Sequence, residues 1–400
     1  MPGRRTVAIA GTALAVWTLG RLLGSPTVHV VAVALALLPI VAGVLARRAA
    51  PRIAARRVLS TDRAVPGERI TVDLELEGAG RRAIPFLLVE DRLPSALGGA
   101  TRLVVTKIPA RGRGARRVSY AIDAPRRGRY AIGPLRIEAA DPFGFTPVRV
   151  DLDLRDELVV TPPVEDLLGV GGSPFGHAGG AALARRLARG GGEFSLMRPY
   201  REGDDLRRIH WPSVARRGEL MIRQDEASSR PRAMLHLDTR ARALGASGGE
   251  IFEQAVGAAA SVGVALLRSG LSLRRSTGLL PPEPTTEDAL LDVLAGVGED
   301  GTDVFATLAR LRASGTADAL FVVVTGTLAP EELAALTRTG TAFGPRLAIL
   351  VPPRAGADTT DAALHTLARA GWQVRAVPPG TTLRERWTID APTQRVGSSS

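Results

Sequence analysis

The chain of 400 residues contains no cysteine, which excludes a disulfide framework, a zinc–thiolate site and a thiol nucleophile. Aromatic residues make up only 4% of the sequence, so few side chains are present on which nucleic-acid bases could stack. Acidic residues are absent from the first 57 positions, which hold eight arginines. The apolar fraction of 45% suits a globular protein that also carries some membrane sequence.

The uneven distribution of charge weighs against nucleic-acid binding. Of the formal net charge of +12, residues 1–57 contribute +8, so residues 58–400 carry only +4. We therefore expect no nucleic acid among the partners. The N-terminal excess is typical of the flanks of membrane-spanning helices.

Two apolar runs, at residues 7–23 and 28–46, are each close to the ~20 residues that a helix needs to cross a bilayer. Only a Gly-Ser-Pro-Thr turn separates them, which predicts a transmembrane helical hairpin within a segment of residues 1–57. Arginines precede the first run and follow the second, so the positive-inside rule places both termini in the cytoplasm. The predicted location is the cell membrane, with two spanning helices.

Residues 58–160 carry short runs of alternating polarity separated by turn sequences, a pattern that predicts an all-β sandwich. The span 102–136 holds ten basic residues and one acid, Asp123. Two interpretations stay open: solvated turns and strand faces, or a patch that rests on anionic lipid headgroups. Residues 161–190, rich in Pro, Gly and Ala, are expected to form a flexible linker.

Beyond residue 232, apolar strand patterns alternate with helical patterns. Strands are expected at 233–237, 271–275, 320–325, 347–351 and 372–377, and helices at 250–269, 286–295, 303–313, 330–339 and 360–370. This alternation predicts a mostly parallel sheet covered on both faces. The α/β domain and the segment before it are expected to span 191–390, followed by a tail at 391–400. The predicted fold class is multi-domain: a transmembrane hairpin, an all-β sandwich and an α/β domain.

The densest cluster of charged and aromatic residues lies at 190–226. Its main members are Glu193, Arg198, Tyr200, Gly203, Asp204, Arg207, Arg208, Trp211 and Arg216. Their order resembles the signature of the bacterial domain of unknown function 58 family. Arg-Arg-Gly-Arg-Tyr at 126–130 and Asp-Pro-Phe-Gly at 141–144 support this resemblance, which covers residues 120–240. The resemblance implies a von Willebrand factor A-like (Rossmann-like) domain and a MoxR-type AAA+ ATPase as partner.

Domains of the von Willebrand factor A type commonly bind a divalent cation through Asp-x-Ser-x-Ser after the first strand, with a Thr and an Asp from later loops. Here Asp238 is followed by Arg240 and Arg242 at the two hydroxyl positions, and the later loop begins Thr325-Gly326-Thr327. Two arginines would repel a cation, so we predict a degraded metal-site position at Asp238, and no cofactor. Asp238 is instead expected to pair with Arg240, Arg242 or an arginine of the signature.

The signature has three interpretations. Its acids and arginines could pair with one another and pack the segment on the α/β sheet. The same residues could present arginine and aromatic anchors to a partner protein. A catalytic role would use the cluster from Asp204 to Trp211, where His210 lies near Asp204, but no nucleophile stands in a recognised motif.

The leading hypothesis is a non-enzymatic, membrane-anchored adaptor or assembly protein that faces the cytosol and works with the ATPase through the von Willebrand factor A-like domain. The alternative is a membrane-surface enzyme of cell-envelope metabolism that uses the cluster from Asp204 to Trp211. A third hypothesis is a cation-dependent adhesion module despite the altered motif at Asp238.

Overall fold

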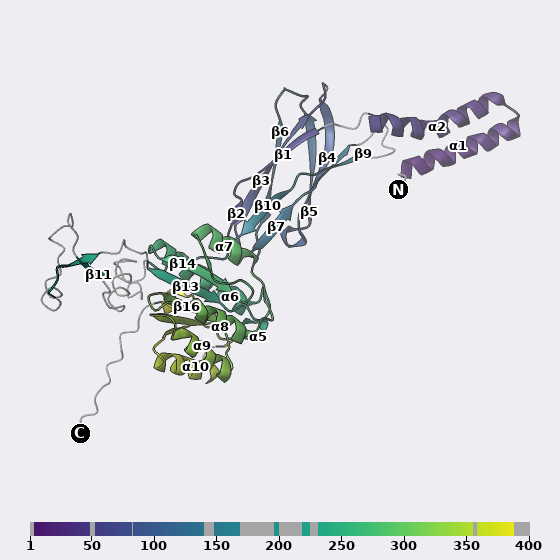
Figure 1. The fold of residues 1–400 in the computed structure, drawn as a ribbon. Coiled ribbons are helices and arrows are strands. Elements are labelled where there is room, and N and C mark those ends of the chain that lie inside the picture. The colour runs from purple at the N-terminus through teal and green to yellow at the C-terminus, as the bar shows by residue number, and fades with distance from the viewer. Residues whose placement is uncertain are drawn as a thin grey trace. The chain divides into compact units, whose positions relative to one another are not determined.

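Figure 1 shows the computed structural model, which describes residues 4–48, 53–81, 83–139, 148–168, 196–199, 218–224, 231–354 and 358–387. The chain divides into two compact units, Met1–Thr161 and Pro162–Ser400. The first contains two N-terminal helices and an all-β part, and the second contains an α/β sheet. The protein is therefore multi-domain, with helices at its N-terminus and several sheets after them.

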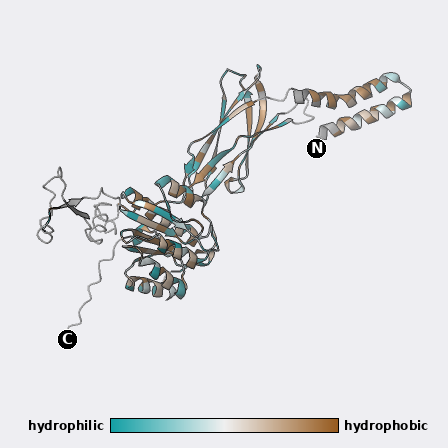
Figure 2. Ribbon diagram, in the orientation of Figure 1, coloured by the Kyte–Doolittle hydropathy of each residue, from teal (hydrophilic) through white to brown (hydrophobic). Residues whose placement is uncertain are grey.

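The two N-terminal helices, α1 (Arg4–Leu23) and α2 (Pro26–Arg48), pack side by side. Gly24 allows the tight turn between them with a φ of +62°. The rings of Trp17 and His29 meet edge to face, with centroids 4.8 Å apart. Both helices are apolar along most of their length (Figure 2). Their exposed large apolar side chains include Leu14, Leu22, Val30 and Ile40.

Another apolar helix of membrane-spanning length lies in the second unit. By length and composition, α6 (Glu250–Arg268) could cross a membrane, but 72% of its apolar stretch is buried, as in the core helix of a globular unit. The apolar stretches of α1 and α2, Val7–Leu23 and Pro26–Val41, are shorter.

The strands of the all-β part have the alternation of buried and more exposed residues that the sequence predicts. In β3 the inward positions Ile70, Val72, Leu74 and Leu76 are fully buried, while the positions between them are not. The strands are β1 (Ile53–Leu59), β2 (Arg63–Ala64), β3 (Arg69–Gly78), β4 (Ile84–Arg92), β5 (Ala100–Ile108), β6 (Arg116–Asp123), β7 (Gly128–Ile132), β8 (Leu135–Ala139), β9 (Val148–Leu152) and β10 (Asp156–Val160). They form sheets ordered β1-β3-β6, β2-β10-β7 and β5-β4-β8-β9 around one hydrophobic core.

A buried polar cluster ties these sheets together. Arg57 donates to both oxygens of Asp91, from Nε at 3.0 Å and from Nη2 at 2.6 Å, and both side chains are fully buried. The hydroxyl of Tyr120 also donates to Asp91, at 2.6 Å, and Arg57 reaches Asp156 at 2.5 Å. The structure thus places Arg57, the last of the arginines in the predicted membrane flank, inside the β core. Strand β1 begins within the segment that the sequence assigns to that flank.

The second unit is built on a six-stranded sheet. Its elements are β13 (Arg232–Leu237), α5 (Ala241–Leu244), α6, β14 (Ser272–Thr277), β15 (Glu283–Pro284), α7 (Glu287–Gly296), α8 (Val304–Ala313), β16 (Leu320–Thr325), α9 (Pro330–Gly340), β17 (Arg346–Leu350), α10 (Asp358–Arg369) and β18 (Gln373–Ala376). The strand order is β15-β14-β13-β16-β17-β18, and all pairings are parallel except that of the edge strand β15.

Helices cover both faces of this sheet, as the alternation of patterns predicts. Leu235, Val322 and Ile349 face one hydrophobic cluster with residues of α6 and α7. Met234 and Phe321 face the other cluster with residues of α8, α9 and α10. Because successive residues point to opposite faces, every residue of the central strand β16 is buried.

Residues 162–168, in the stretch expected to be a linker, pack against this unit. The amide of Glu165 donates to Ser261 of α6 at 2.9 Å, and its carboxylate accepts from the amides of Leu383 and Arg384. Leu167 and Trp387 are both buried in the core. The α/β unit therefore includes residues that precede β13 in the sequence and residues that follow β18.

Two short antiparallel strands, β11 (Leu196–Pro199) and β12 (Met221–Gln224), lie within the segment 190–226 that contains the signature.

Candidate functional site at the carboxyl edge of the parallel sheet

The candidate site lies where the strand order reverses. Strand β13 lies between β14 and β16. The strands that follow β13 in the sequence, β14 and β15, extend the sheet on one side of it, and the later strands β16, β17 and β18 extend it on the other side. In open α/β sheets, ligands bind outside the carboxyl ends of the strands at such a switch point. Here Asp238 follows β13 and Thr325 ends β16, so both side chains stand at this position.

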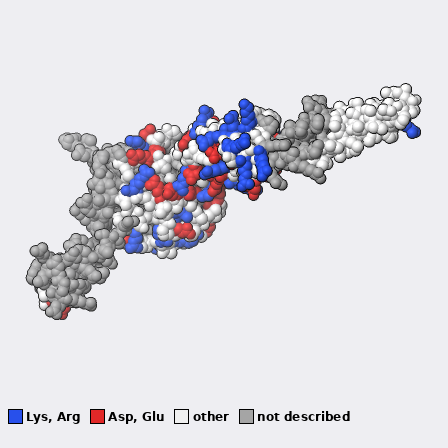
Figure 3. Space-filling view, turned by 90° about the horizontal axis from the view of Figure 1, so that it is seen from above, with Lys and Arg blue, Asp and Glu red and all other residues white. Residues whose placement is uncertain are grey.

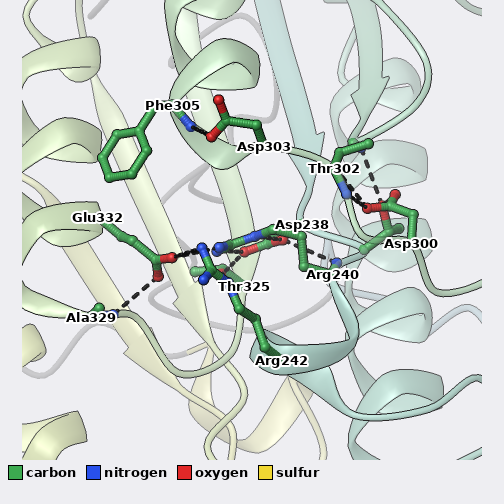
Figure 4. Close-up of polar contacts among 12 residues, drawn as sticks. Asp238, Arg240, Arg242, Asp300, Thr302, Asp303, Phe305, Thr325, Ala329 and Glu332 are labelled. Atoms are coloured by element: carbon green, nitrogen blue, oxygen red, sulfur yellow. Dashed lines mark hydrogen bonds and ion pairs between the residues drawn. The ribbon is translucent and has the colours of Figure 1, made fainter.

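An internal guanidinium occupies the space beside Asp238 (Figure 4). Arg240 donates from Nε to Oδ1 of Asp238 at 2.8 Å and from Nη2 to Oδ2 at 2.7 Å. Thr325 donates its hydroxyl to the same Oδ2 at 2.7 Å. The side chains of Asp238 and Arg240 are 8% and 3% exposed, so water competes little for these contacts.

Glu332 completes the arrangement from helix α9. One oxygen of its carboxylate accepts from Nη1 of Arg240 at 2.7 Å and also from Arg242. Its other oxygen accepts from the amide of Ala329 at 3.1 Å, which caps the start of α9. Arg240 is therefore held between two carboxylates from different elements, whereas the side chain of Arg242 is 66% exposed.

These contacts keep the pair ionised. Burial acts to raise the pKa of Asp238, but the hydrogen bonds and charge of Arg240, with the hydroxyl of Thr325, outweigh it and lower that pKa. Burial acts to lower the pKa of Arg240, yet Asp238 and Glu332 raise it overall. The edge of the sheet therefore carries a fixed cation at physiological pH.

A pocket of about 460 Å³ adjoins this ion pair, lined by Arg240, Ala241, Arg242, Asp300, Gly301, Thr302 and Asp303. Asp300 accepts from the hydroxyls of Thr239 at 2.5 Å and Thr302 at 2.7 Å. Asp303 accepts from the amide of Phe305 at 2.9 Å and so caps α8, while the ring of Phe305 remains 46% exposed.

The residues present do not fit a divalent cation at Asp238. Both oxygens of this carboxylate already accept hydrogen bonds from Arg240, and a guanidinium charge stands where a cation would sit. Within the residues that the structure describes, no group of three His, Asp or Glu side chains is arranged to hold a metal. Pairing of Asp238 with Arg240, one of the expected alternatives, is confirmed.

His236 lies two residues before Asp238, buried in β13. Burial lowers its pKa to about 4, and its Nδ1 lies 3.4 Å from Oγ of Ser276. The ring is therefore neutral at physiological pH and part of the core.

The signature residues lie almost entirely outside the described residues. This applies to Glu193, Tyr200, Gly203, Asp204, Arg207, Arg208, Trp211 and Arg216, and to His210 of the proposed catalytic cluster. Arg198 lies in β11, where it is paired with Ile222 of β12. That the signature residues form one interaction surface therefore stays a prediction.

Sequence reasoning missed Glu332 and the pocket around Asp300. Glu332 has a local signal, because Ala-Pro-Glu-Glu is typical of a helix start. Its contact with Arg240, however, joins residues 92 positions apart and depends on the strand order.

Comparisons with known proteins agree with the signature. A family model described as "Protein of unknown function DUF58" matches residues 196–351. The chain is 25% identical over 358 residues to the uncharacterized protein YeaD of Bacillus subtilis (strain 168), which covers 82% of this chain and 83% of YeaD.

Similarity to solved structures is too low to inform the fold. The CARDB domain of the PF1109 protein from Pyrococcus furiosus matches at 12% identity with a TM-score of 0.20, over 28% of this chain and 91% of that domain. The sporulation control protein Spo0M from Bacillus subtilis matches at 13% identity with a TM-score of 0.16, over 27% of this chain and 49% of Spo0M.

Proposed function

We propose that this protein is a membrane-anchored, cytosol-facing adaptor that works with a MoxR-type AAA+ ATPase through a von Willebrand factor A-like domain. The observation that carries the proposal is the architecture of the second unit. Numbered along the unit, its strands are ordered 3-2-1-4-5-6, the doubly wound order, with Asp238 at the carboxyl end of the first strand. That arrangement supports the fold implied by the family resemblance.

The membrane anchor is supported by the surface of the N-terminal helices. Side chains such as Leu22, 85% exposed, and Val30, 68% exposed, would be costly in water over so continuous a surface. The absence of acids from the first 57 residues and the arginines at both ends of the hairpin favour cytoplasmic termini.

An interaction role is supported by the chemistry of the switch point. Arg240 occupies the cation position, which argues against cation-dependent adhesion. Arg242 and Phe305 are exposed near the pocket, and arginine and aromatic side chains are the common anchors of protein interfaces. The signature residues Arg207 and Arg208 are further candidates for the same interface.

The test is co-purification of the cognate ATPase with the tagged full chain from detergent-solubilised native membranes, with and without a slowly hydrolysed ATP analogue. Recovery of a MoxR-type ATPase that depends on nucleotide, and that is lost in a folded Arg207→Ala/Arg208→Ala variant, would support the proposal. Failure to recover it in any nucleotide state would count against the adaptor role and favour the enzyme alternative.

A further inference from the structure

One end of the all-β part gathers basic side chains that have no carboxylate partner among the described residues. The end is formed by the β3–β4 loop and the β5–β6 loop, which are joined by backbone hydrogen bonds. Gly78 donates to Pro109 at 2.9 Å, and Arg111 donates to Gly80 at 3.0 Å. The exposed basic side chains of these loops and the strand ends beside them are Arg81, Lys107, Arg111, Arg113 and Arg116. We call these five residues the basic end.

Six exposed or partly exposed arginines elsewhere in the all-β part are paired with carboxylates. Ion pairs join Arg69 to Asp123, Arg102 to Glu90, Arg117 to Glu75, Arg129 to Glu157, Arg136 to Asp151 and Arg149 to Glu138. At the basic end, Glu77 accepts from the amide of Gly112 at 2.5 Å, so this acid braces the loop instead of pairing with an arginine. Figure 3 shows Lys and Arg side chains gathered over the all-β part.

Chain length limits how far this end can lie from the hairpin. Helix α2 ends at Arg48 and β1 begins at Ile53, and an extended chain spans at most about 3.6 Å per residue, or about 18 Å over these five steps. In the β1–β3 pairing, Ile53 lies opposite Gly78, which begins the first loop of the basic end. If α2 spans the membrane as proposed, Ile53 is tethered within about 18 Å of the end of that helix, and the basic end is at the same end of the strands as Ile53.

We propose that the basic end docks on anionic lipid headgroups of the cytoplasmic leaflet and so orients the all-β part on the membrane. The inference rests on the proposed membrane anchor. Guanidinium groups bind phosphate oxygens in bidentate fashion, and each basic residue near an anionic surface favours the docked state by roughly fivefold at low salt. The loop residues 79–83 and 109–115 contain no aromatic side chain, which disfavours a single-stranded nucleic acid as the occupant.

The experiment uses the full chain in lipid nanodiscs made of phosphatidylcholine alone or of phosphatidylcholine mixed with phosphatidylglycerol. Hydrogen exchange is followed in peptides that cover residues 109–115. The test variant is Arg111→Ala/Arg113→Ala. The matched control is Arg126→Ala/Arg129→Ala, which removes two exposed arginines at the opposite end of β6.

We expect exchange in 109–115 to slow several-fold in the anionic nanodiscs, and high salt to remove this protection, because salt screens exposed charges. The control variant should keep the protection and the test variant should lose it. Equal exchange in both lipids, or protection that appears only when an acidic polymer such as RNA is added, would overturn the inference.

A separate extraction tests the membrane anchor. Release of the full chain from native membranes by alkaline carbonate would overturn the anchor. Retention would support the anchor, whichever result the exchange experiment gives.

Discussion

Arg240 and Asp238, two residues apart in the loop after β13, form a bidentate ion pair at the switch point of the parallel sheet, with distances of 2.8 and 2.7 Å. The pair is fixed from both sides, by Thr325 of the neighbouring strand and by Glu332 of α9. A position that would hold a divalent cation in a metal-dependent domain here contains a cation from the chain itself. The positive charge beside Asp238, at the carboxyl edge of the sheet, therefore does not depend on a bound metal ion.

Magnesium and chelators should leave the stability of the wild-type α/β unit unchanged. A ligand stabilises only the state that binds it, and the oxygens of Asp238 are already occupied. Thermal melts of the detergent-solubilised full chain with Mg²⁺, Mn²⁺ or EDTA should therefore coincide. A midpoint that rises with Mg²⁺ concentration would contradict the assignment of Arg240 as the internal cation.

Replacing Arg240 should be strongly destabilising. Arg240→Ala leaves the buried carboxylates of Asp238 and Glu332 without their shared cation, and breaking a buried pair from one side costs about 3–5 kcal/mol. Arg242→Ala removes a mostly exposed side chain from Glu332 and should cost less than about 1 kcal/mol. Urea unfolding of the two variants checks the difference, and similar losses in both would show that the burial of Arg240 is not decisive.

Because of His236, the free energy of unfolding of the α/β unit should decrease as the pH falls from 6.5 to 4. Burial lowers the pKa of the folded histidine to about 4, so over this range the unfolded chain binds a proton that the folded chain does not. The stabilisation is present above pH 6.5 and its loss reaches about 3 kcal/mol near pH 4. Unfolding free energies measured against pH should show a shallower slope for His236→Gln. The control is His365→Gln, which changes an exposed histidine of α10.

The buried cluster in the all-β part should carry much of the stability of that part. Asp91→Ala leaves the buried guanidinium of Arg57 with Asp156 as its one carboxylate partner among the described residues and should cost about 3 kcal/mol or more. Tyr120→Phe removes one hydrogen bond to an oxygen of Asp91 that still accepts from Nε of Arg57, and should cost about 1 kcal/mol. Hydrogen exchange of β1, β4 and β6 in urea measures both changes. Arg129→Ala, which removes an exposed ion pair, is the control and should change the stability by less than about 1 kcal/mol.

The absence of cysteine makes the predicted topology directly measurable. Single cysteines at Thr27, in the first turn of α2, and at Ala317, between α8 and β16, introduce unique thiols into an otherwise cysteine-free chain. In intact cells, a membrane-impermeant maleimide should label Thr27→Cys and leave Ala317→Cys unlabelled until the cells are opened. Labelling of both from outside would contradict a cytosolic α/β unit.

Sequence patterns predict this fold well where periodicity is strong and poorly where contacts are remote. The apolar run at 320–325 predicts β16 with its observed bounds, since a central parallel strand is buried on both faces. The two-residue strands β2 and β15 carry no period that a pattern could reveal. The pairing of Asp238 with Arg240 is one of the alternatives that the sequence leaves open. The contact of Glu332 with Arg240 and the Arg57–Asp91 pair depend on tertiary packing, because each joins segments far apart in the sequence.

The most direct test of the adaptor role is the affinity of the purified cognate MoxR-type ATPase for the full chain in nanodiscs, measured with a slowly hydrolysed ATP analogue. The wild-type protein is compared with Arg242→Ala, at the switch point, and with Arg312→Ala, an exposed arginine at the end of α8 near the opposite edge of the sheet. We predict nucleotide-dependent binding that Arg242→Ala weakens by at least about tenfold, or about 1.4 kcal/mol, while Arg312→Ala leaves it unchanged. Equal affinity for all three proteins, or no binding with any nucleotide, would contradict this prediction.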